Sequence, residues 1–197
     1  MTQQRISFYF DILSPASYLA WTQLPNLVDP HLIDYRPIFL AGVFKGSQNI
    51  PPILNPSKAR YMRQDFLRCA QHYNVPMHFN RSFPFNSLVP MRILAALTSD
   101  SELFHRVLHV LFESTWVNDH KVDELQALNA ALSDAGLDAD ALIALGHDEN
   151  SKRLLQQETE AAVERGVFGA PTFFVGDEMF FGQDRLDFVV QAIQKNH

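Results

Sequence analysis

The sequence predicts an α/β fold in which a strand-helix-strand unit and a strand-strand-helix unit enclose a long helical stretch. Two observations predict this order. Short apolar runs rich in aromatic residues occur near both ends of the chain, at 6–10, 33–40 and 171–181. Residues 57–165 instead repeat their apolar side chains at helical spacing. This order is that of the thioredoxin-like fold, with an all-helical domain inserted in its middle.

The N-terminal unit is predicted from three segments. Residues 6–10 are typical of a short strand that is buried on both faces at the centre of a sheet. A helix should begin at Pro15, because Ser14 can cap its first turn and proline leaves no N–H unpaired there. Residues 33–40 predict a second strand, which a right-handed crossover places parallel to the first. Pro37 indicates an edge or a bulge in that strand.

Residues 41–56 predict a long loop, because they include two glycines, three prolines and two asparagines. A loop of this length is often functional, although it can be a simple connector. Ser57 is a possible cap for the helix that follows, and Gly136 and Gly166 stand where C-terminal glycines are expected. The helices of the insertion are predicted near residues 57–73, 87–98, 101–115, 122–135 and 148–165.

The C-terminal unit is predicted from a turn and a cap. The dipeptide Gly176-Asp177 separates two aromatic runs, which favours an antiparallel hairpin. Asp184 is a natural N-cap for a final helix. We therefore expect a discontinuous thioredoxin-like domain, and an inserted helical domain between its halves. The first domain comprises residues 1–56 and 166–197, and the insertion comprises residues 57–165.

Composition excludes several classes of protein. The formal net charge is -6, with 22 acidic and 16 basic residues and no run of Lys or Arg, so we expect neither a nucleic-acid partner nor attraction to an anionic membrane. No charged-then-apolar leader is present, and no apolar run approaches the roughly 20 residues of a membrane helix. We therefore expect a cytoplasmic protein.

Cysteine and histidine usage narrows the chemistry further. Because Cys69 is the only cysteine, the chain cannot form an intrachain disulfide, a Cys-x-x-Cys redox pair or a cysteine-built zinc site. His105 and His109 lie four residues apart, but no third ligand is near them in sequence. We expect no bound metal.

The junction at Ser14 is the strongest candidate site from local physics alone. A strand that runs directly into a helix presents free N–H groups and the positive end of the helix dipole to any group above the turn. An anion such as a thiolate is stabilised in that position. The alternative is that Ser14 only caps the helix.

Four motifs, in their order and spacing, carry a resemblance that spans nearly the whole chain. They are Phe10-Asp-Ile-Leu-Ser-Pro-Ala-Ser-Tyr18, Leu40-Ala-Gly-Val-Phe-Lys45, Val167-Phe-Gly-Ala-Pro-Thr172 and Phe181-Gly-Gln-Asp-Arg-Leu186. Together they resemble the 2-hydroxychromene-2-carboxylate isomerase and kappa-class glutathione transferase family. That family is similar to the DsbA-like disulfide oxidoreductases, with serine in place of the first redox cysteine. Here Ser14-Pro-Ala-Ser17 occupies the Cys-x-x-Cys place.

The resemblance implies a role for Ser14 and for the Ala170-Pro171 step. Ser14 is expected to donate its hydroxyl to the sulfur of bound glutathione and to favour its thiolate, since a free thiol has a pKa of about 8.5. No base that would deprotonate Ser14 is evident nearby in sequence, so serine need not be the nucleophile. The Ala170-Pro171 bond is expected to be cis, and to leave the Ala170 N–H and C=O free to pair with the cysteinyl part of glutathione.

The resemblance also implies further glutathione contacts. Asp184 is expected to hold the γ-glutamyl ammonium, with Gln183 and Arg185 beside it, and its role as a helix cap is the alternative. Asn49 and Lys58 match polar positions that contact glutathione. Lys58 is expected to take the glycyl carboxylate as a point charge, and the alternative is a solvated lysine.

The substrate implied by the resemblance is an aromatic carboxylate, which needs apolar walls and one or two cations. We expect a glutathione-dependent isomerase that acts by transient thiolate addition and works as a homodimer. The alternatives are a kappa-like transferase or peroxidase acting on electrophiles, and a non-catalytic thiol-binding or peptide-binding module. The residues expected to face Ser14 across the substrate are Phe44, Lys45, Phe85, Asn86 and Arg92.

Overall fold

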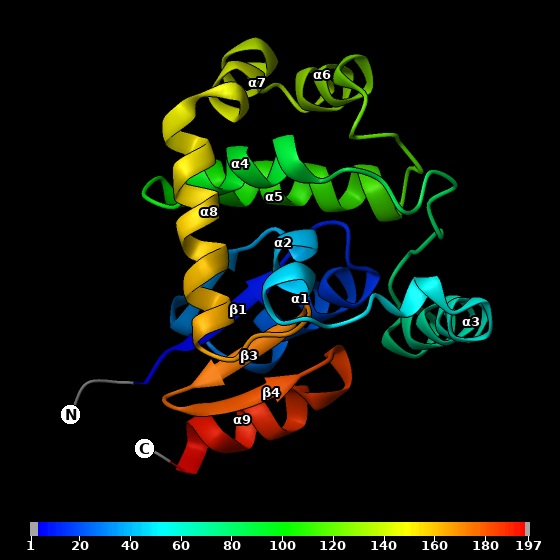
Figure 1. Ribbon diagram of the computed structural model, residues 1–197, viewed down its shortest axis with the longest axis vertical. Helices are drawn as coiled ribbons and strands as arrows, with labels where there is room; N and C mark the ends of the chain where they lie inside the picture. The colour runs from blue at the N-terminus through cyan, green and yellow to red at the C-terminus, as the bar shows by residue number, and fades with distance from the viewer. Residues whose placement is uncertain (1–3, 196–197) are drawn as a thin grey trace.

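One mixed sheet lies at the base of the structure, a computed structural model that describes residues 4–195 (Figure 1). Within those residues the strand order is β2-β1-β3-β4. Strand β1 (Ile6–Phe10) pairs in parallel with β2 (Ile33–Pro37) and antiparallel with β3 (Thr172–Val175). Strand β4 (Glu178–Phe181) completes the hairpin with β3. The predicted central strand, parallel crossover, edge strand and C-terminal hairpin are therefore confirmed.

Alternation along β1 divides the core into two clusters, because successive side chains of a strand point to opposite faces. Phe8 and Phe10 join the larger cluster, together with side chains of α1 (Pro15–Leu27) and α9 (Leu186–Lys195). Tyr9 joins the smaller cluster, with side chains of α2 (Leu40–Gly46) and α8. The sheet is thus covered on both faces, as the thioredoxin-like prediction requires.

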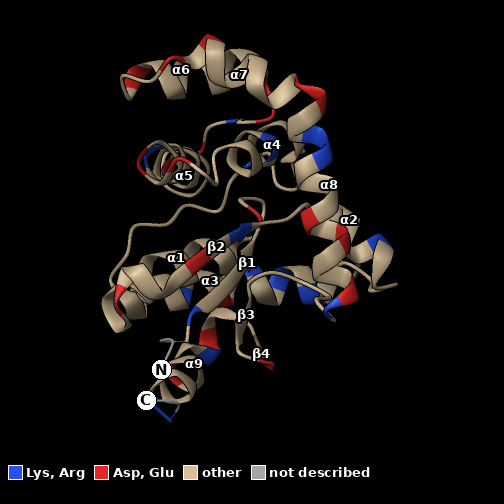
Figure 2. Ribbon diagram, turned by 90° about the vertical axis from the view of Figure 1, so that its left-hand side faces the viewer, with Lys and Arg blue, Asp and Glu red and all other residues tan. Residues whose placement is uncertain are grey.

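Apart from α3 (Pro56–Tyr73), which packs beside α1, the helices between the two halves of the sheet lie above it in layers (Figure 1). Helices α6 and α7 lie farthest from the sheet, with α4 and α5 between them and the strands (Figures 1 and 2). The larger core cluster runs without a break from β1 and α1 into α4 and α5, so the insertion and the sheet share one core. The other inserted helices are α4 (Leu88–Ala96), α5 (Ser101–Trp116), α6 (Leu125–Asp134), α7 (Ala139–His147) and α8 (Glu149–Glu164).

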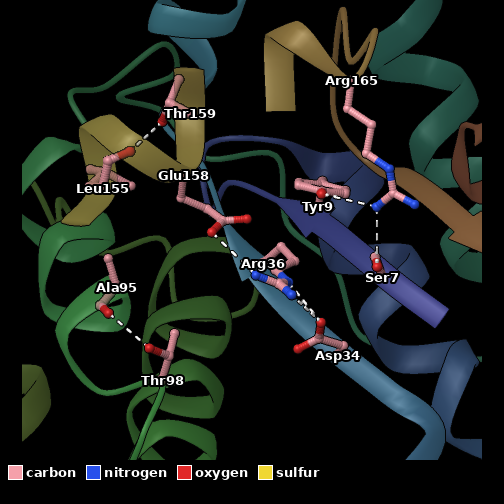
Figure 3. Close-up of polar contacts among 10 residues, drawn as sticks. All are labelled: Ser7, Tyr9, Asp34, Arg36, Ala95, Thr98, Leu155, Glu158, Thr159 and Arg165. Atoms are coloured by element: carbon pink, nitrogen blue, oxygen red, sulfur yellow. Dashed lines mark hydrogen bonds and ion pairs between the residues drawn. The ribbon is translucent and has the colours of Figure 1, made fainter. Parts of the chain in front are cut away.

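Helix α8 runs from this upper layer back to the sheet, where arginine contacts hold it. Arg36 of β2 pairs with Asp34 at 2.7 Å and with Glu158 of α8 at 3.4 Å (Figure 3). Arg165, at the end of α8, donates to Tyr9 Oη at 3.2 Å. These contacts fix α8 against the same sheet face that α2 covers.

The segment predicted as a loop, 41–56, is partly helical. It contains most of α2 and a short 3₁₀ turn, Pro52–Leu54, and the preceding strand ends at Pro37 rather than at residue 40. The glycines have a packing cause, because a Cβ atom on Gly42 would lie 3.1 Å from Thr159 Cγ2 of α8. The prediction was wrong because these glycines permit close helix packing rather than a loop.

Two helix boundaries in the insertion also differ from the prediction. Asn55, not Ser57, caps α3, since its side chain accepts the N–H groups of the first turn and Pro56 takes the first helical position. Helix α7 was not predicted, although Asp138 caps it. Its Gly146 argues against a helix in sequence, but a Cβ there would lie 3.1 Å from the Val89 carbonyl oxygen, so tight packing against α4 explains it.

The two glycines predicted at helix C-termini are confirmed. Gly136 and Gly166 follow their helices with positive φ angles of 69° and 98°, which favour glycine. No helix among residues 4–195 is both long enough and apolar enough to cross a membrane. The limits of the inserted domain, 57–165, stay a prediction.

Candidate functional site

Ser14 is the N-cap of α1 and lies directly after the turn that leaves β1. Its Oγ accepts the N–H of Ser17 at 3.1 Å, so the predicted capping role is confirmed. The same hydroxyl donates to the carbonyl oxygen of Ala170 at 2.9 Å. Ser14 is only 5% exposed, and the positive end of the α1 dipole points at its hydroxyl.

Ala170 contacts Ser14 from the segment directly before β3, the strand that pairs with β1, and Pro171 follows it. The bond between them is cis, as the resemblance implied. The expectation that both polar groups of Ala170 are free needs a correction, because the Ser14 hydroxyl already uses the carbonyl oxygen. Among the described residues, no hydrogen bond uses the Ala170 N–H. One backbone donor beside Ser14 is therefore available to a ligand.

Asn49 lies on the far side of the cis step. Its side-chain amide donates to the Phe168 carbonyl oxygen at 2.9 Å, two residues before Ala170, and its backbone N–H donates to Phe44 at 3.1 Å. The structure thus brings Asn49 to the segment that carries Ala170. Lys58 is exposed on the first turn of α3, and its ammonium makes no hydrogen bond or ion pair with any residue in the range 4–195.

The three residues Gln183–Arg185 form a 3₁₀ turn rather than the start of the last helix, so Asp184 does not cap α9 as predicted. Instead the Asp184 carboxylate pairs with Arg185 at 2.7 Å, and both side chains are about half exposed. This turn packs against α1, and Gly182 before it donates its N–H to the Pro171 carbonyl oxygen at 3.0 Å. Asp184 therefore stands on the same side of α1 as the cis step.

Gln183 is turned away from solvent toward α3. It is buried, and its amide donates a long contact of 3.9 Å to Cys69 Sγ. Burial raises the pKa of the Cys69 thiol, which favours its neutral form. Cys69 is therefore not an activated thiol in this structure.

Asp11 is a site feature that the sequence analysis did not single out. Its side chain is fully buried, and burial raises the pKa of the carboxyl to about 6 against the donors that contact it. Those donors are the N–H of Leu13 at 2.9 Å, the N–H of Leu40 at 2.8 Å and the hydroxyl of Ser87 at 3.0 Å. The only sequence signal was its place three residues before Ser14.

The residues expected to line the substrate side are not all brought together. Phe85 is buried in the larger core cluster, and Phe44 is half-buried against the smaller one. Asn86 is exposed and accepts the N–H of Leu88 at 3.0 Å. The neighbouring Ser87 contacts Asp11, so the segment around Phe85 does lie beside the Ser14 turn.

Lys45 and Arg92 line a separate pocket of about 590 Å³ between α2, α4 and α8. Ser14 and Ala170 are not among the residues that line it. Its walls are largely apolar, with Phe39, Leu88 and Leu155 among them. The Nε atom of Arg92 is buried without a hydrogen-bond partner in the described part of the chain.

This arrangement can stabilise an anion without redox chemistry of its own. The Ser14 hydroxyl lies at the α1 N-terminus and contacts Ala170, whose N–H is unused among the described residues, so an anion beside Ser14 can be stabilised once the hydroxyl turns from the Ala170 carbonyl. No pair of cysteines is present to exchange a disulfide. Among residues 4–195, no group of three His, Cys, Asp or Glu side chains is placed to hold a metal ion.

A thioredoxin-like fold with serine at the start of α1 and a cis-proline facing it defines a DsbA-like protein without the redox cysteines. The DSBA-like thioredoxin domain family matches residues 5–194, and the chain belongs to it. It belongs within that family to the group of 2-hydroxychromene-2-carboxylate isomerases and kappa-class glutathione transferases, which are enzymes.

Individual relatives support this placement. The chain is 34% identical to a 2-hydroxychromene-2-carboxylate isomerase of Sphingobium xenophagum, over 93% of this chain and 95% of that one. It is 29% identical to human glutathione S-transferase kappa 1, over 95% and 90% of the two chains. A solved 2-hydroxychromene-2-carboxylate isomerase superposes with a TM-score of 0.83 at 31% identity, covering 97% of this chain and 95% of the other.

Proposed function

We propose that the protein is a glutathione-dependent isomerase of the 2-hydroxychromene-2-carboxylate type. The single observation that carries the proposal is the placement of the Ser14 hydroxyl at the N-terminus of α1, against Ala170 and the cis-proline, in a chain without a cysteine pair. Sequence relatives that bear this isomerase name add support.

The residues around Ser14 fit glutathione. The Ala170 N–H has no partner among the described residues, so it can donate to a ligand backbone as an added strand does. The Asp184 carboxylate, which pairs with Arg185, can also accept hydrogen bonds from the γ-glutamyl ammonium. The exposed Lys58 offers an unpaired ammonium to the glycyl carboxylate. Each charged end of the tripeptide therefore has a candidate partner.

Bound glutathione would supply a thiolate that adds reversibly to a conjugated carbon, so that a double bond becomes a rotatable single bond until the thiolate leaves. The protein's part is to hold that sulfur charged and in place. Ser14 would turn its hydrogen from the Ala170 carbonyl to the sulfur, and the α1 N-terminus would lower the thiol pKa. Ser14 acts as a donor in this scheme and never loses its proton.

Calorimetry with glutathione tests the first half of the proposal. The wild type should bind glutathione with a lowered thiol pKa, followed by the thiolate ultraviolet band against pH. Ser14→Ala should bind it with a thiol pKa near the free value. Ser17→Ala is the matched control, because its buried hydroxyl makes no hydrogen bond in the described structure. No binding at millimolar glutathione would sink the proposal.

Mass spectrometry of the product separates the isomerase from the kappa-type transferase, which the similar identity to human glutathione S-transferase kappa 1 keeps as the second candidate. A rearranged substrate of unchanged mass supports the isomerase. A glutathione conjugate supports the transferase, and binding without turnover of any hydroxychromene or general electrophile supports a non-catalytic module.

The assembly and the location of the protein complete the proposal. We propose a homodimer, as expected from the family resemblance, and a location in the cytoplasm, as expected from the sequence composition. Light scattering after gel filtration tests the dimer, and cell fractionation tests the location. A monomer at micromolar concentration would contradict the dimer.

A further inference from the structure

Asp11 shapes the turn that ends at Ser14. Its Oδ1 atom accepts the N–H of Leu13 at 2.9 Å, and its backbone carbonyl oxygen accepts the N–H of Ser14 at 3.0 Å. Asp11 therefore fixes the last two backbone donors before the helix, those of Leu13 and Ser14. The Ser14 side chain leaves this turn directly, so its direction follows from the turn's geometry.

The other carboxylate oxygen of Asp11 reaches two segments that are distant in sequence. Oδ2 accepts the N–H of Leu40, the first residue of α2, at 2.8 Å. It also accepts the hydroxyl of Ser87, the residue before α4, at 3.0 Å. Neither Phe39 nor Ser87 caps its own helix with a side chain, so Asp11 supplies the missing acceptor to α2 and takes the hydroxyl of Ser87.

Ile12, the next residue of the turn, is also held by the insertion. Its N–H donates to Met91 Sδ of α4 at 3.4 Å, and its carbonyl oxygen accepts the Trp116 Nε1–H of α5 at 2.9 Å. Trp116 is fully buried. Side chains of two inserted helices thus satisfy the backbone of the turn that precedes Ser14.

A fully buried carboxylate is costly, as its raised pKa shows. Stability alone does not require a charge there, because apolar groups of similar shape often replace buried charges without loss. The three donors come from three separate segments, two of which carry the candidate substrate residues Lys45 and Phe85. Their shared acceptor fixes the relative position of those segments.

We propose that Asp11 is the positioning residue of this site. Its carboxylate holds the Ser14 hydroxyl at a fixed position relative to the N-termini of α2 and α4. Asp11 touches neither glutathione nor substrate and acts through Ser14 and the two segments. The proposal rests on the proposed function for its consequence in catalysis. Its geometric content is tested without glutathione.

A thiol placed at position 14 reports that geometry. In the Ser14→Cys variant, alkylation by iodoacetamide is followed against pH, and peptide mass spectrometry separates position 14 from Cys69. The thiol at position 14 should have a lowered pKa because it faces the α1 N-terminus. Cys69 serves as an internal control in the same molecule.

Adding Ser87→Ala to the Ser14→Cys variant breaks one contact of Asp11 without removing a charge. We expect the pKa of the thiol at position 14 to rise by about one unit, a tenfold loss of thiolate at a given pH, while the Cys69 rate stays unchanged. Ser151→Ala is the matched control, because this buried serine of α8 has a hydroxyl without a partner in the described structure. It should leave both thiols unchanged.

Asp11→Asn in the otherwise unmodified enzyme provides the kinetic test. Loss of register should lower kcat by roughly tenfold to a hundredfold, as small misplacements do, with glutathione affinity within about twofold of the wild type. If Asp11→Asn does not fold, kcat and glutathione affinity are measured on the Ser87→Ala and Trp116→Phe variants instead. A folded set with wild-type kcat and an unchanged thiol pKa at position 14 would overturn the proposal. A wild type that fails to bind glutathione would refute the proposed function but leave the thiol test intact.

Discussion

The hydroxyl of Ser14 donates a hydrogen bond to the carbonyl oxygen of Ala170 at 2.9 Å, across 156 positions of the sequence. A serine hydroxyl has one hydrogen, and this contact uses it. Any ligand atom that Ser14 stabilises by donation must therefore take that hydrogen from Ala170. The contact also holds Ser14 in one orientation before a ligand arrives, and breaking it is part of the cost of binding.

Ser14→Ala should destabilise the protein even without a ligand. The substitution removes the N-cap, which costs about 1 kcal/mol, and leaves the Ala170 carbonyl unpaired, which adds about 1 kcal/mol. We expect a free energy of unfolding about 2 kcal/mol lower, measured by urea denaturation. Ser17→Ala should change it little, because the Ser17 hydroxyl has no partner in the described structure. Equal losses in the two variants would contradict the contacts assigned to Ser14.

Lys58→Gln should weaken glutathione binding modestly and in a salt-dependent way. The ammonium is exposed, so its ion pair with the glycyl carboxylate is worth about 1 kcal/mol or less, which is a loss of up to about fivefold in affinity. Calorimetry at low and high salt measures this loss, and the difference should shrink at high salt. Glutathione esterified at its glycyl carboxylate should bind both proteins equally. Lys121→Gln, an exposed lysine of the insertion, is the control.

Arg92→Gln tests whether the pocket between α2, α4 and α8 receives the carboxylate of the substrate. The buried Nε atom of Arg92 has no acceptor among the described residues, and a carboxylate would supply one. We expect KM for the aromatic substrate to rise about tenfold, with glutathione affinity unchanged. Steady-state kinetics measures both. An unchanged KM would place the substrate carboxylate elsewhere.

Local patterns predicted the frame of the fold. The aromatic run of β1, the Ser14-Pro15 helix start and the Gly176-Asp177 turn each express a short-range preference, and the structure confirms all three. Helix α2 was missed because its glycines reflect contact with α8, which lies more than a hundred residues later. Sequence alone cannot distinguish a glycine that permits a turn from one that permits close packing.

The site residues also fall into those that the sequence predicted and those that it did not. Ser14 could be predicted from the local helix start, whereas the cis bond at Pro171 was expected only from the family resemblance. Asp11 was missed, because its Oδ2 partners lie 29 and 76 positions away and nothing in the local sequence marks the carboxylate as buried. The Asp184 cap failed because a 3₁₀ turn intervenes before α9.

Asp11 should also leave a signature in the pH dependence of stability. Burial disfavours the charged form and raises the pKa of the Asp11 carboxyl from its ordinary value of 3.8 to about 6 in the folded protein. Between these values the folded state binds more protons than the unfolded state, so this carboxyl makes the protein less stable as pH rises. The contribution is fully present below pH 4 and is lost by the time pH passes through about 6.

Asp11→Asn removes that titration, and comparison with the wild type isolates it from all other groups. The free energy of unfolding of the wild type minus that of the variant should fall by about 2 kcal/mol between pH 4 and pH 7, since each pKa unit corresponds to about 1.4 kcal/mol and the unfolded carboxyl is already partly deprotonated at pH 4. Urea denaturation at a series of pH values measures the difference. A difference that stays flat, or rises with pH, would mean that the Asp11 carboxyl is not buried as the structure shows. It would then have no means of fixing the N-termini of α2 and α4 relative to Ser14.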